Sequence, residues 1–334
     1  MPPKKQGKDG ELDPTEKLYR VYRKNLAAAG LAMPKKLEER FAELRNGKLA
    51  TSLTELIVWD EVGPDGMRVL ADTLRDLDYK LLRQIRLWGA RIEDDGARSL
   101  CQFLDTNHTV VHLELKGCGI TSVGCACLTT TLGLKVRSSI AILKLDHNNI
   151  GSEGCNRISE ALAMNATITE LSLTYCNIEA EAADKLFEAL IFMGTSVREL
   201  DLTGNYLRNP GVVQLMRAFL INRTVKKLTL ADNQFGEDPQ VLEGLKDVLH
   251  CNDCLSFLDL NFNGFYVEGV TYIRNALIET EVDGVRKNST LQTLILPDKF
   301  PKELYVEIIG ILSTNKKKKK KGKKGKKGKK SKKK

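Results

Sequence analysis

Apolar residues recur along the chain in one pattern, L-x-x-L-x-L-x-x-N/C-x-L, whose last position is Ile, Leu or another apolar residue. The clearest copies begin at Val110, Ile140, Ile168, Val197 and Val225. Alternating apolar residues within each copy predict a short strand with one buried face. Apolar residues at intervals of four then predict a helix. One strand and one helix cannot bury their apolar faces alone, so the pattern predicts a stack of repeats.

Weaker copies extend the register at both ends of the chain. With the first apolar residue of each copy as position 1, the copies begin at Leu53, Leu82, Val110, Ile140, Ile168, Val197, Val225, Leu255 and Leu291. The spacing is 28 to 30 residues except for the last interval of 36, which leaves room for a full helix in each repeat. The additional residues around 279–287 predict a longer helix or loop.

Position 9 of the repeat is polar or small in every clear copy. A buried Asn side chain there can hydrogen-bond the free backbone groups of the turn after each strand, and Cys is a small, weakly hydrogen-bonding substitute. We therefore predict a structural ladder made of Cys118, Asn148, Cys176, Asn205, Asn233 and Asn263.

The Asn/Cys pattern and long period, from about Leu53 to Asn315, resemble those of the ribonuclease-inhibitor-like class of leucine-rich-repeat proteins. The resemblance implies an α/β fold, a right-handed horseshoe-shaped solenoid of about nine repeats. Its parallel sheet would line the concave side and its helices the convex side. Positions 4 and 6 then face the core, and positions 3, 5 and 7 face the open side of the sheet.

The two ends depart from the repeat. Asp13-Pro14-Thr15-Glu16 is the signature of a helix start, and Pro34 opens a second helix that stops at Asn46-Gly47. We predict a disordered basic N-terminus at 1–10, a helical cap at 11–50, a leucine-rich-repeat domain at 51–315 and a disordered poly-Lys tail at 316–334. Pro297 and Pro301 in the last copy suit a C-terminal cap.

Charge is divided unevenly along the chain. Residues 316–334 hold 15 lysines and no acidic residue, so subtracting them from the net charge of +9 leaves −6 for the remainder. A segment with no apolar residue to bury predicts disorder, and a lysine run suits a tether to a polyanion. A solubility tail or a nuclear-import signal are alternative interpretations. The predicted tether begins with Lys316, Lys317, Lys318, Lys319, Lys320 and Lys321.

Signatures of catalysis are absent from the sequence. It has no phosphate loop, dinucleotide fingerprint or nucleophile elbow, and its histidines show no metal-ligand spacing. Cys251-Asn-Asp-Cys254 has no second pair at a zinc-like distance. We therefore predict a protein that is not an enzyme, with no cofactor, no metal site and no small-molecule substrate.

Processing and membrane signals are also lacking. We find no secretion signal and no run of eighteen apolar residues, which predicts reduced thiols and no membrane span. Four Asn-x-Thr sequences precede strands at one phase of the repeat, which indicates turn structure rather than glycosylation. They begin at Asn107, Asn165, Asn222 and Asn288.

The open face of the predicted sheet carries the candidate partner-binding residues Trp59, Arg86, Trp88, Lys116 and Lys144. Both tryptophans occupy position 7 of adjacent repeats beside Arg86, and Trp and Arg are frequent interface anchors. The alternative is that the N-terminal helices fold over the tryptophans.

These features predict a non-catalytic scaffold or adaptor that binds a protein partner. The Met-Pro-Pro-Lys-Lys start, the Lys-rich tail and Leu87-Trp88 are similar to features of ciliary and flagellar members of the class. That resemblance implies a cytoplasmic component of the axoneme, whose tail meets the acidic tails of tubulin.

Three other functions remain open. Ran GTPase-activating protein shares the repeat class and implies a GTPase-activating regulator, but that family's acidic C-terminal tail is here replaced by a basic one. A nuclear or nucleolar RNA-associated protein would use the tail for phosphate attraction. A ribonuclease inhibitor proper implies a strongly acidic concave face and more cysteine than this chain holds.

Overall fold

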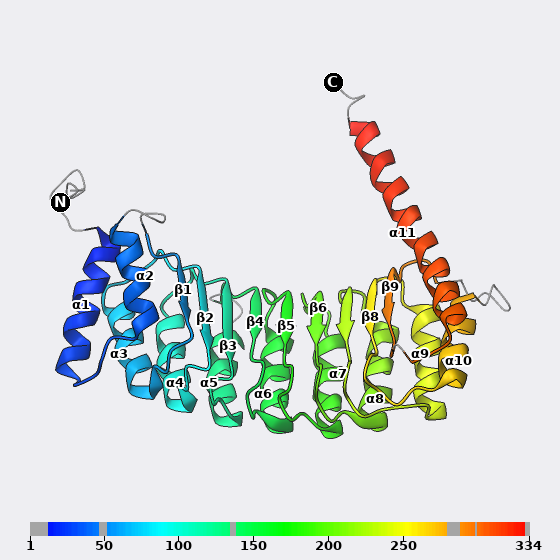
Figure 1. Ribbon diagram of the computed structural model, residues 1–334, viewed down its shortest axis with the longest axis horizontal. Helices are drawn as coiled ribbons and strands as arrows, with labels where there is room; N and C mark the ends of the chain where they lie inside the picture. Colours follow the sequence, from blue (N-terminus) through cyan, green and yellow to red (C-terminus); the bar gives the residue numbers. More distant parts are fainter. Residues whose placement is uncertain (1–12, 47–51, 134–137, 279–287, 298, 331–334) are drawn as a thin grey trace. The chain divides into compact units, whose positions relative to one another are not determined.

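The chain forms two compact units, Met1–Cys176 and Asn177–Lys334. The computed structural model describes residues 13–46, 52–133, 138–278, 288–297 and 299–330, with the backbone alone from residue 317 on (Figure 1). Our predictions for residues 1–10 and for the additional segment 279–287 lie outside the described residues. Each unit is a stack of strand–helix repeats, so the predicted leucine-rich-repeat α/β fold class is confirmed.

Five parallel strands, paired in sequence order, form the sheet of the first unit. They are β1 (Glu55–Val58), β2 (Gln84–Trp88), β3 (His112–Lys116), β4 (Ile142–Lys144) and β5 (Glu170–Ser172). The helices on one side of this sheet are α3 (Gly63–Asp76), α4 (Glu93–Leu104), α5 (Ser122–Gly133) and α6 (Gly151–Met164) (Figure 1). Position 4 lies in register across the strands, and its side chains, such as Leu113 and Leu143, are fully buried. The alternation of apolar and polar residues predicted from the sequence therefore determines which face of the sheet is buried.

The second unit repeats this arrangement with four parallel strands. They are β6 (Glu199–Asp201), β7 (Lys227–Thr229), β8 (Phe257–Asp259) and β9 (Thr293–Ile295). Its helices are the short 3-10 helix η1 (Ala180–Ala182), α7 (Ala183–Ile191), α8 (Arg208–Ile221), α9 (Pro239–Cys251), α10 (Val267–Ile278) and α11 (Lys302–Lys330).

Two helices, α1 (Pro14–Ala28) and α2 (Lys35–Arg45), precede the first repeat, as predicted. The Asp13 carboxylate accepts hydrogen bonds from the backbone N–H groups of Thr15 and Glu16, at 2.9 and 3.4 Å, and so satisfies two amides at the start of α1. Asn25 donates to the Thr73 hydroxyl of α3 at 3.0 Å. Helix α1 thus covers the end of the helix layer that would otherwise face water.

The first ladder consists of the position 9 side chains, and it closes the turn after each strand. The Asn148 oxygen accepts hydrogen bonds from the N–H groups of Cys118 and Ile120, at 2.9 and 3.1 Å. Its amide group donates to the carbonyl of Leu115 at 2.6 Å. The Cys118 thiol donates to the carbonyl of Leu87 at 3.4 Å. Each repeat therefore satisfies the turn of the repeat before it.

Members of the first ladder in the second unit make the same contacts. Asn205 accepts from the N–H of Ile178 at 3.1 Å. Asn263 accepts from the N–H of Asn233 at 2.8 Å and donates to the carbonyl of Leu230 at 2.9 Å. Buried backbone groups that would otherwise lack partners are satisfied in series.

A second ladder lies just before β3, β5, β7, β8 and β9 and ends within α11, and it explains the Asn-x-Thr sequences. The Asn222 oxygen accepts from the N–H groups of Thr224 and Val225, at 3.0 and 2.9 Å, while its amide donates to the carbonyl of Leu190 at 2.7 Å. The amide that a glycan would need is buried and hydrogen-bonded. The buried members are Asn107, Asn165, Asn222, Asn252, Asn288 and Asn315.

Glycine recurs at position 15 because the helix start approaches the preceding repeat closely. A Cβ atom on Gly124 would lie 2.5 Å from Asp94 Oδ1, whose carboxylate accepts from the N–H groups of Thr121 and Gly124, at 2.8 and 2.9 Å. Glu237 contacts the N–H of Gly269 in the same way, at 2.7 Å. An acidic side chain of one repeat thus caps the helix of the next.

The predicted boundary at residue 316 is corrected by α11, which continues to Lys330. Its first turns are anchored, because Ile308 and Leu312 are buried and Arg274 pairs with Glu307. Lysine has a good helix propensity, and adding it to an existing helix avoids the unfavourable nucleation step. The sequence argument considered only the lack of apolar residues. Lys316 is exposed, and the side chains of 317–321 lie outside the described part of the chain.

We expect Asn205→Ala to lower the free energy of unfolding by about 1–3 kcal/mol, because it leaves buried backbone groups unpaired. Asn275→Ala is the matched control, since Asn275 is exposed on α10 and should change stability by less than about 0.5 kcal/mol. Urea denaturation measures both. Equal stability of the two variants would contradict the structural role of the first ladder.

Candidate functional site

Two stacked tryptophans stand on the strand face of the first unit. The rings of Trp59 and Trp88 lie 5.9 Å apart between centroids with an interplanar angle of 15°. Their exposed fractions are 52% and 37%. Helix α2 reaches this place through Lys36, whose Nζ lies 6.0 Å from the Trp59 ring and whose N–H donates to Asp60 at 2.6 Å. The cap therefore contacts the pair but does not cover it.

Hydrogen bonds between neighbouring strands hold the polar groups around this pair. Trp88 Nε1 donates to Glu114 Oε1 at 2.7 Å. Arg86 donates through a terminal nitrogen to Gln84 Oε1 at 2.5 Å, and Gln84 in turn donates to Glu55 Oε1 at 3.1 Å. Arg86 Nε is buried and has no hydrogen-bond partner among the described residues. The Nε–H group of this guanidinium is therefore not used by the described residues.

The two predicted lysines have different surroundings. Lys144 Nζ lies 2.6 Å from Glu170 Oε1. Burial alone would lower the pKa of Lys144, but the hydrogen bond and charge of Glu170 outweigh it and raise the pKa. Lys116 is exposed and pairs with no acidic group among the residues that the structure describes. Of the two, Lys116 is the cation left for a partner.

His112 lies between Arg86 and Glu114 on the same face. Burial lowers the pKa of His112, and the positive charge of Arg86 lowers it further. The imidazole is therefore neutral at pH 7, and its 3.5 Å contact with Glu114 is not an ion pair.

A second aromatic pair was missed in the sequence. The rings of His147 and Tyr175 are stacked 4.9 Å apart with an interplanar angle of 15°. Both occupy position 8, where the backbone is left-handed, with φ of 57° and 52°. Gly89, Gly117, Gly204, Asp232 and Phe262 occupy position 8 in other repeats, also with positive φ, so comparing the residues there would have drawn attention to the rings.

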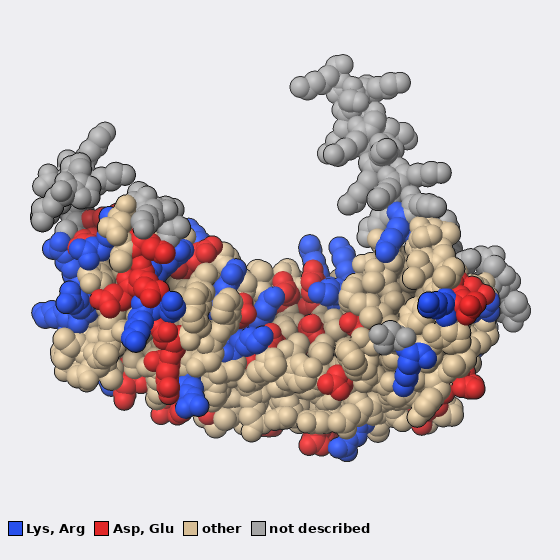
Figure 2. All heavy atoms as spheres, in the orientation of Figure 1, with Lys and Arg blue, Asp and Glu red and all other residues tan. Residues whose placement is uncertain are grey.

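Charged side chains of both signs are interspersed on the face of the first unit shown in Figure 2. Groups of one sign that would mark a nucleic-acid surface are not gathered on this face of the described part. The aromatic residues are therefore its distinguishing feature.

The cysteines are spread through the helices and turns, and none of the eight forms a disulfide. Burial raises the pKa of Cys101, Cys118, Cys155 and Cys176 to about 12. Thiols in such surroundings remain protonated and unreactive near pH 7. Cys251 and Cys254 flank the ladder residue Asn252, which accepts from the N–H of Cys254 at 2.9 Å.

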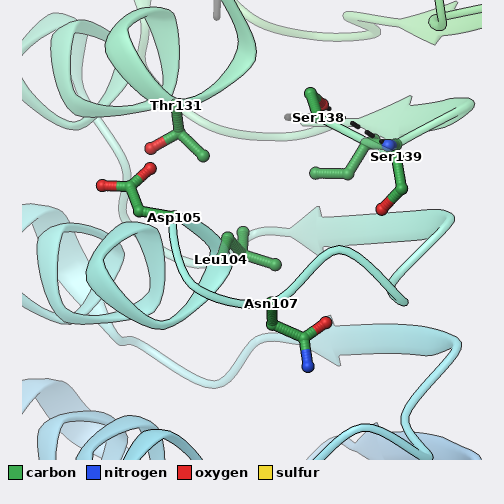
Figure 3. A pocket seen from close by; sticks show the side chains of 7 residues that line it. Leu104, Asp105, Asn107, Thr131, Ser138 and Ser139 are labelled. Atoms are coloured by element: carbon green, nitrogen blue, oxygen red, sulfur yellow. Dashed lines mark hydrogen bonds between the residues drawn. The ribbon is translucent and has the colours of Figure 1, made fainter. Parts of the chain in front are cut away.

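A small depression lies between the end of α4, α5 and the start of β4 (Figure 3). It encloses about 270 Å³ including the open solvent at its mouth, so little of it is an enclosed cavity. Two of its polar groups are bonded within the chain: the Ser138 hydroxyl accepts from the N–H of Ile140 at 3.4 Å, and Ser139 donates to the carbonyl of Val110 at 2.6 Å.

Within the described residues, no three His, Cys, Asp or Glu side chains gather as metal ligands. Among the same residues, no helix has the length and apolar character needed to cross a membrane.

Comparisons with known proteins agree with the repeat register. A family model described as "Leucine Rich repeat" matches residues 106–128 and 165–187. Ribonuclease inhibitor of Sus scrofa is 30% identical over 214 residues, which cover 61% of this chain and 46% of that protein. The Mus musculus ribonuclease inhibitor is 30% identical over 198 residues, which cover 57% and 42%.

A third relative is "NACHT, LRR and PYD domains-containing protein 12" of Mus musculus. It is 30% identical over 206 residues, which cover 61% of this chain and 19% of that protein. The matched part thus spans less than half the length of each of these relatives.

The chain has the leucine-rich-repeat fold, because its strands and ladders follow the register of the two repeats that the family model matches. The matched part of the chain is similar to two ribonuclease inhibitors, at 30% identity.

We expect a thiol reagent at pH 8 to modify Cys251 quickly, Cys127 and Cys254 more slowly, and the five buried cysteines only on unfolding. Burial raises thiol pKa and so removes the reactive thiolate. Time-resolved mass spectrometry counts the modified thiols, and the urea-unfolded chain, which should react at all eight, is the control. Rapid native modification of Cys118 or Cys155 would contradict the packing described here.

Proposed function

We propose that this protein is a non-catalytic scaffold that binds a protein partner on the strand face of its first unit. The observation that carries the proposal is the exposed, stacked pair of Trp59 and Trp88. Burying such rings against a partner is favourable, and Trp is enriched among residues that dominate binding energy. Arg86 and Lys116 on the same strands would orient polar groups of that partner.

The ladders support this proposal because they keep the face rigid. Asn148 fixes the turn after β3 through hydrogen bonds to Cys118 and Leu115. Side chains on a rigid backbone lose less conformational entropy on binding. A protein partner also agrees with the extended surfaces that repeat stacks present.

A non-catalytic role is supported by the chemistry of the candidate nucleophiles. Desolvation raises the pKa of the buried thiols and so holds them protonated. His112 is neutral, and its Nε2 has no hydrogen-bond partner among the described residues.

We further propose that the Lys-rich end of α11 tethers the protein to an acidic polymer, with tubulin tails in a cilium or flagellum as the specific case. The support is the lysine run from Lys316 on and the similarity of the termini to those of axonemal proteins. The rest of the chain carries a net charge of −6 once the 15 tail lysines are subtracted from +9, so attraction to a polyanion would come from the tail. A cytoplasmic, axonemal location is part of this proposal.

We expect Trp88→Ala to weaken partner binding by about 2 kcal/mol or more, because it removes half of the stacked pair. Val123→Ala is the matched control, since Val123 is an exposed apolar residue on α5. Partners captured by the full chain are identified by mass spectrometry, and the affinity of each is then measured by calorimetry. A partner whose affinity is the same for both variants would place its site elsewhere.

A chain that ends at Asn315 should stay folded, because the Asn315 amide still donates to the carbonyls of Asn288 and Leu291. It should keep its protein partner yet lose retention on microtubules. Co-sedimentation of both chains, with and without tubulin tails and across a salt series, measures this. The full chain should pellet strongly at low salt and release steeply as salt screens the charges. Equal pelleting of the two chains at low salt would refute the tether.

A further inference from the structure

The ends of the first unit's strands carry a row of side chains that we call the aromatic edge: Trp59, Trp88, Lys116, His147 and Tyr175. The backbone ladder continues past the strands here, because Gly89, Gly117 and His147 each donate an N–H to the next repeat at 2.8 Å. The turns are therefore in register, and the repeat of Lys116 lies between the repeats that carry the two stacked pairs.

The second pair is held in a backbone conformation that disfavours it. A left-handed backbone is adopted readily by Gly, less so by Asn or Asp, and is unusual for a bulky residue. Gly89 and Gly117 fill the same position in the two repeats before that of His147, whereas Tyr175 has φ of 52° there and is 47% exposed. An exposed ring in a strained position contributes little to the core, and strain of this kind concentrates at functional sites.

The groups on the aromatic edge that are left without a hydrogen-bond partner within the described part of the chain are donors rather than acceptors. Each nearby carboxylate has a donor within the chain: Glu114 accepts from Trp88, Asp146 accepts from Ser172, and Glu170 pairs with Lys144. Lys116 has no acidic partner, and Arg86 Nε has no acceptor, among the described residues. Near the centre of the edge, beside Trp88, Lys116 is therefore left without an acidic hydrogen-bond acceptor from the described residues.

We propose that the aromatic edge binds an extended acidic segment of a partner protein, in which two apolar or aromatic side chains flank a carboxylate. The Trp59–Trp88 and His147–Tyr175 pairs receive the flanking side chains, and Lys116 receives the carboxylate. This inference rests on the proposed protein-binding function and adds His147 and Tyr175 to its site.

The spacing of the repeats sets the spacing of the ligand. The centres of the two pairs are three strand intervals apart, or roughly 14 Å at about 4.8 Å per strand. An extended chain rises about 3.3 Å per residue, so about four residues bridge that distance. The ligand therefore has apolar side chains at i and i+4, with Asp or Glu at i+2. Single-stranded nucleic acid also stacks on aromatic rings, but it carries a phosphate at every nucleotide, and these would meet Glu114 and Asp146, whereas one central carboxylate can be placed at Lys116 alone.

The test selects ligands from a phage-displayed library of random dodecapeptides on the full-length protein. The best peptide is then synthesised with a fluorescent label, and its affinity is measured by anisotropy. Trp59 and Trp88 are the only two tryptophans of the chain, so intrinsic fluorescence reports directly on the first pair. We expect selected peptides to share the apolar–acidic–apolar spacing and to change this fluorescence.

Three variants locate the contacts. Tyr175→Gly should weaken the labelled peptide about tenfold or more, without lowering the melting temperature, because Gly prefers the backbone at that position. Tyr175→Asn, which also tolerates that backbone, should weaken binding equally. Lys116→Ser should weaken binding about fivefold and reduce its salt dependence. Asp232→Gly is the matched control: Asp232 occupies position 8 of its repeat in the second unit, also has positive φ, 53°, and carries no ring.

The outcomes separate this inference from the proposed function. Trp88-dependent binding that is unaffected by Tyr175→Gly and Tyr175→Asn leaves the scaffold proposal standing and overturns the aromatic edge. Selected peptides without an acidic residue at the centre, or equal binding of a labelled oligo-dT probe, overturn the acidic-segment assignment. Selection of no peptide, with a protein partner still dependent on Trp88, also overturns it. Failure of both peptide and partner to depend on Trp88 overturns both proposals.

Discussion

The backbone of a parallel repeat must leave its strand through a turn that is buried against its neighbours, and every polar group in that turn needs a partner. Asparagine meets this need at two positions of the repeat. Asn148 joins the turn after β3 to its own repeat, and Asn222 joins the start of β7 to the end of α7. The strands stay aligned because both of their ends are tied to adjacent repeats.

Alignment of the turns has a consequence for the surface. Position 8 follows the strand directly, and its left-handed backbone projects a side chain from the edge of the sheet without disturbing position 9. Gly117 leaves that place bare, whereas His147 and Tyr175 fill it with stacked rings. The rigid interior of the turn thus permits variation at its exposed residue, which is where a binding surface can be built without changing the core.

Much of the fold could be predicted because the repeat is read directly from spacing. The strands, the position 9 ladder and the cap start at Asp13 follow from apolar periodicity and helix-capping chemistry. The second ladder was only partly anticipated, since Asn252 and Asn315 lack the Asn-x-Thr form that drew attention to the others. The asparagines of this ladder donate hydrogen bonds to carbonyl groups of another repeat, and a linear sequence does not reveal these contacts.

The site was less predictable than the fold. Alternation correctly placed Trp59 and Trp88 on the open face, but their stacking and exposure depend on how far α2 reaches. Lys144 was expected to face a partner and is instead paired with Glu170. Periodicity assigns a face to each side chain, whereas pairing across strands depends on side-chain conformation.

The most direct measurement of the account is native-state hydrogen exchange at the turn amides that asparagine side chains hold. The N–H groups of Cys118 and Ile120 both donate to Asn148. They should therefore exchange as slowly as the amides of β3, through global opening of the first unit. Exchange of these two amides as fast as that of exposed loops would contradict the claim that buried asparagines hold the turns and the surface built on them.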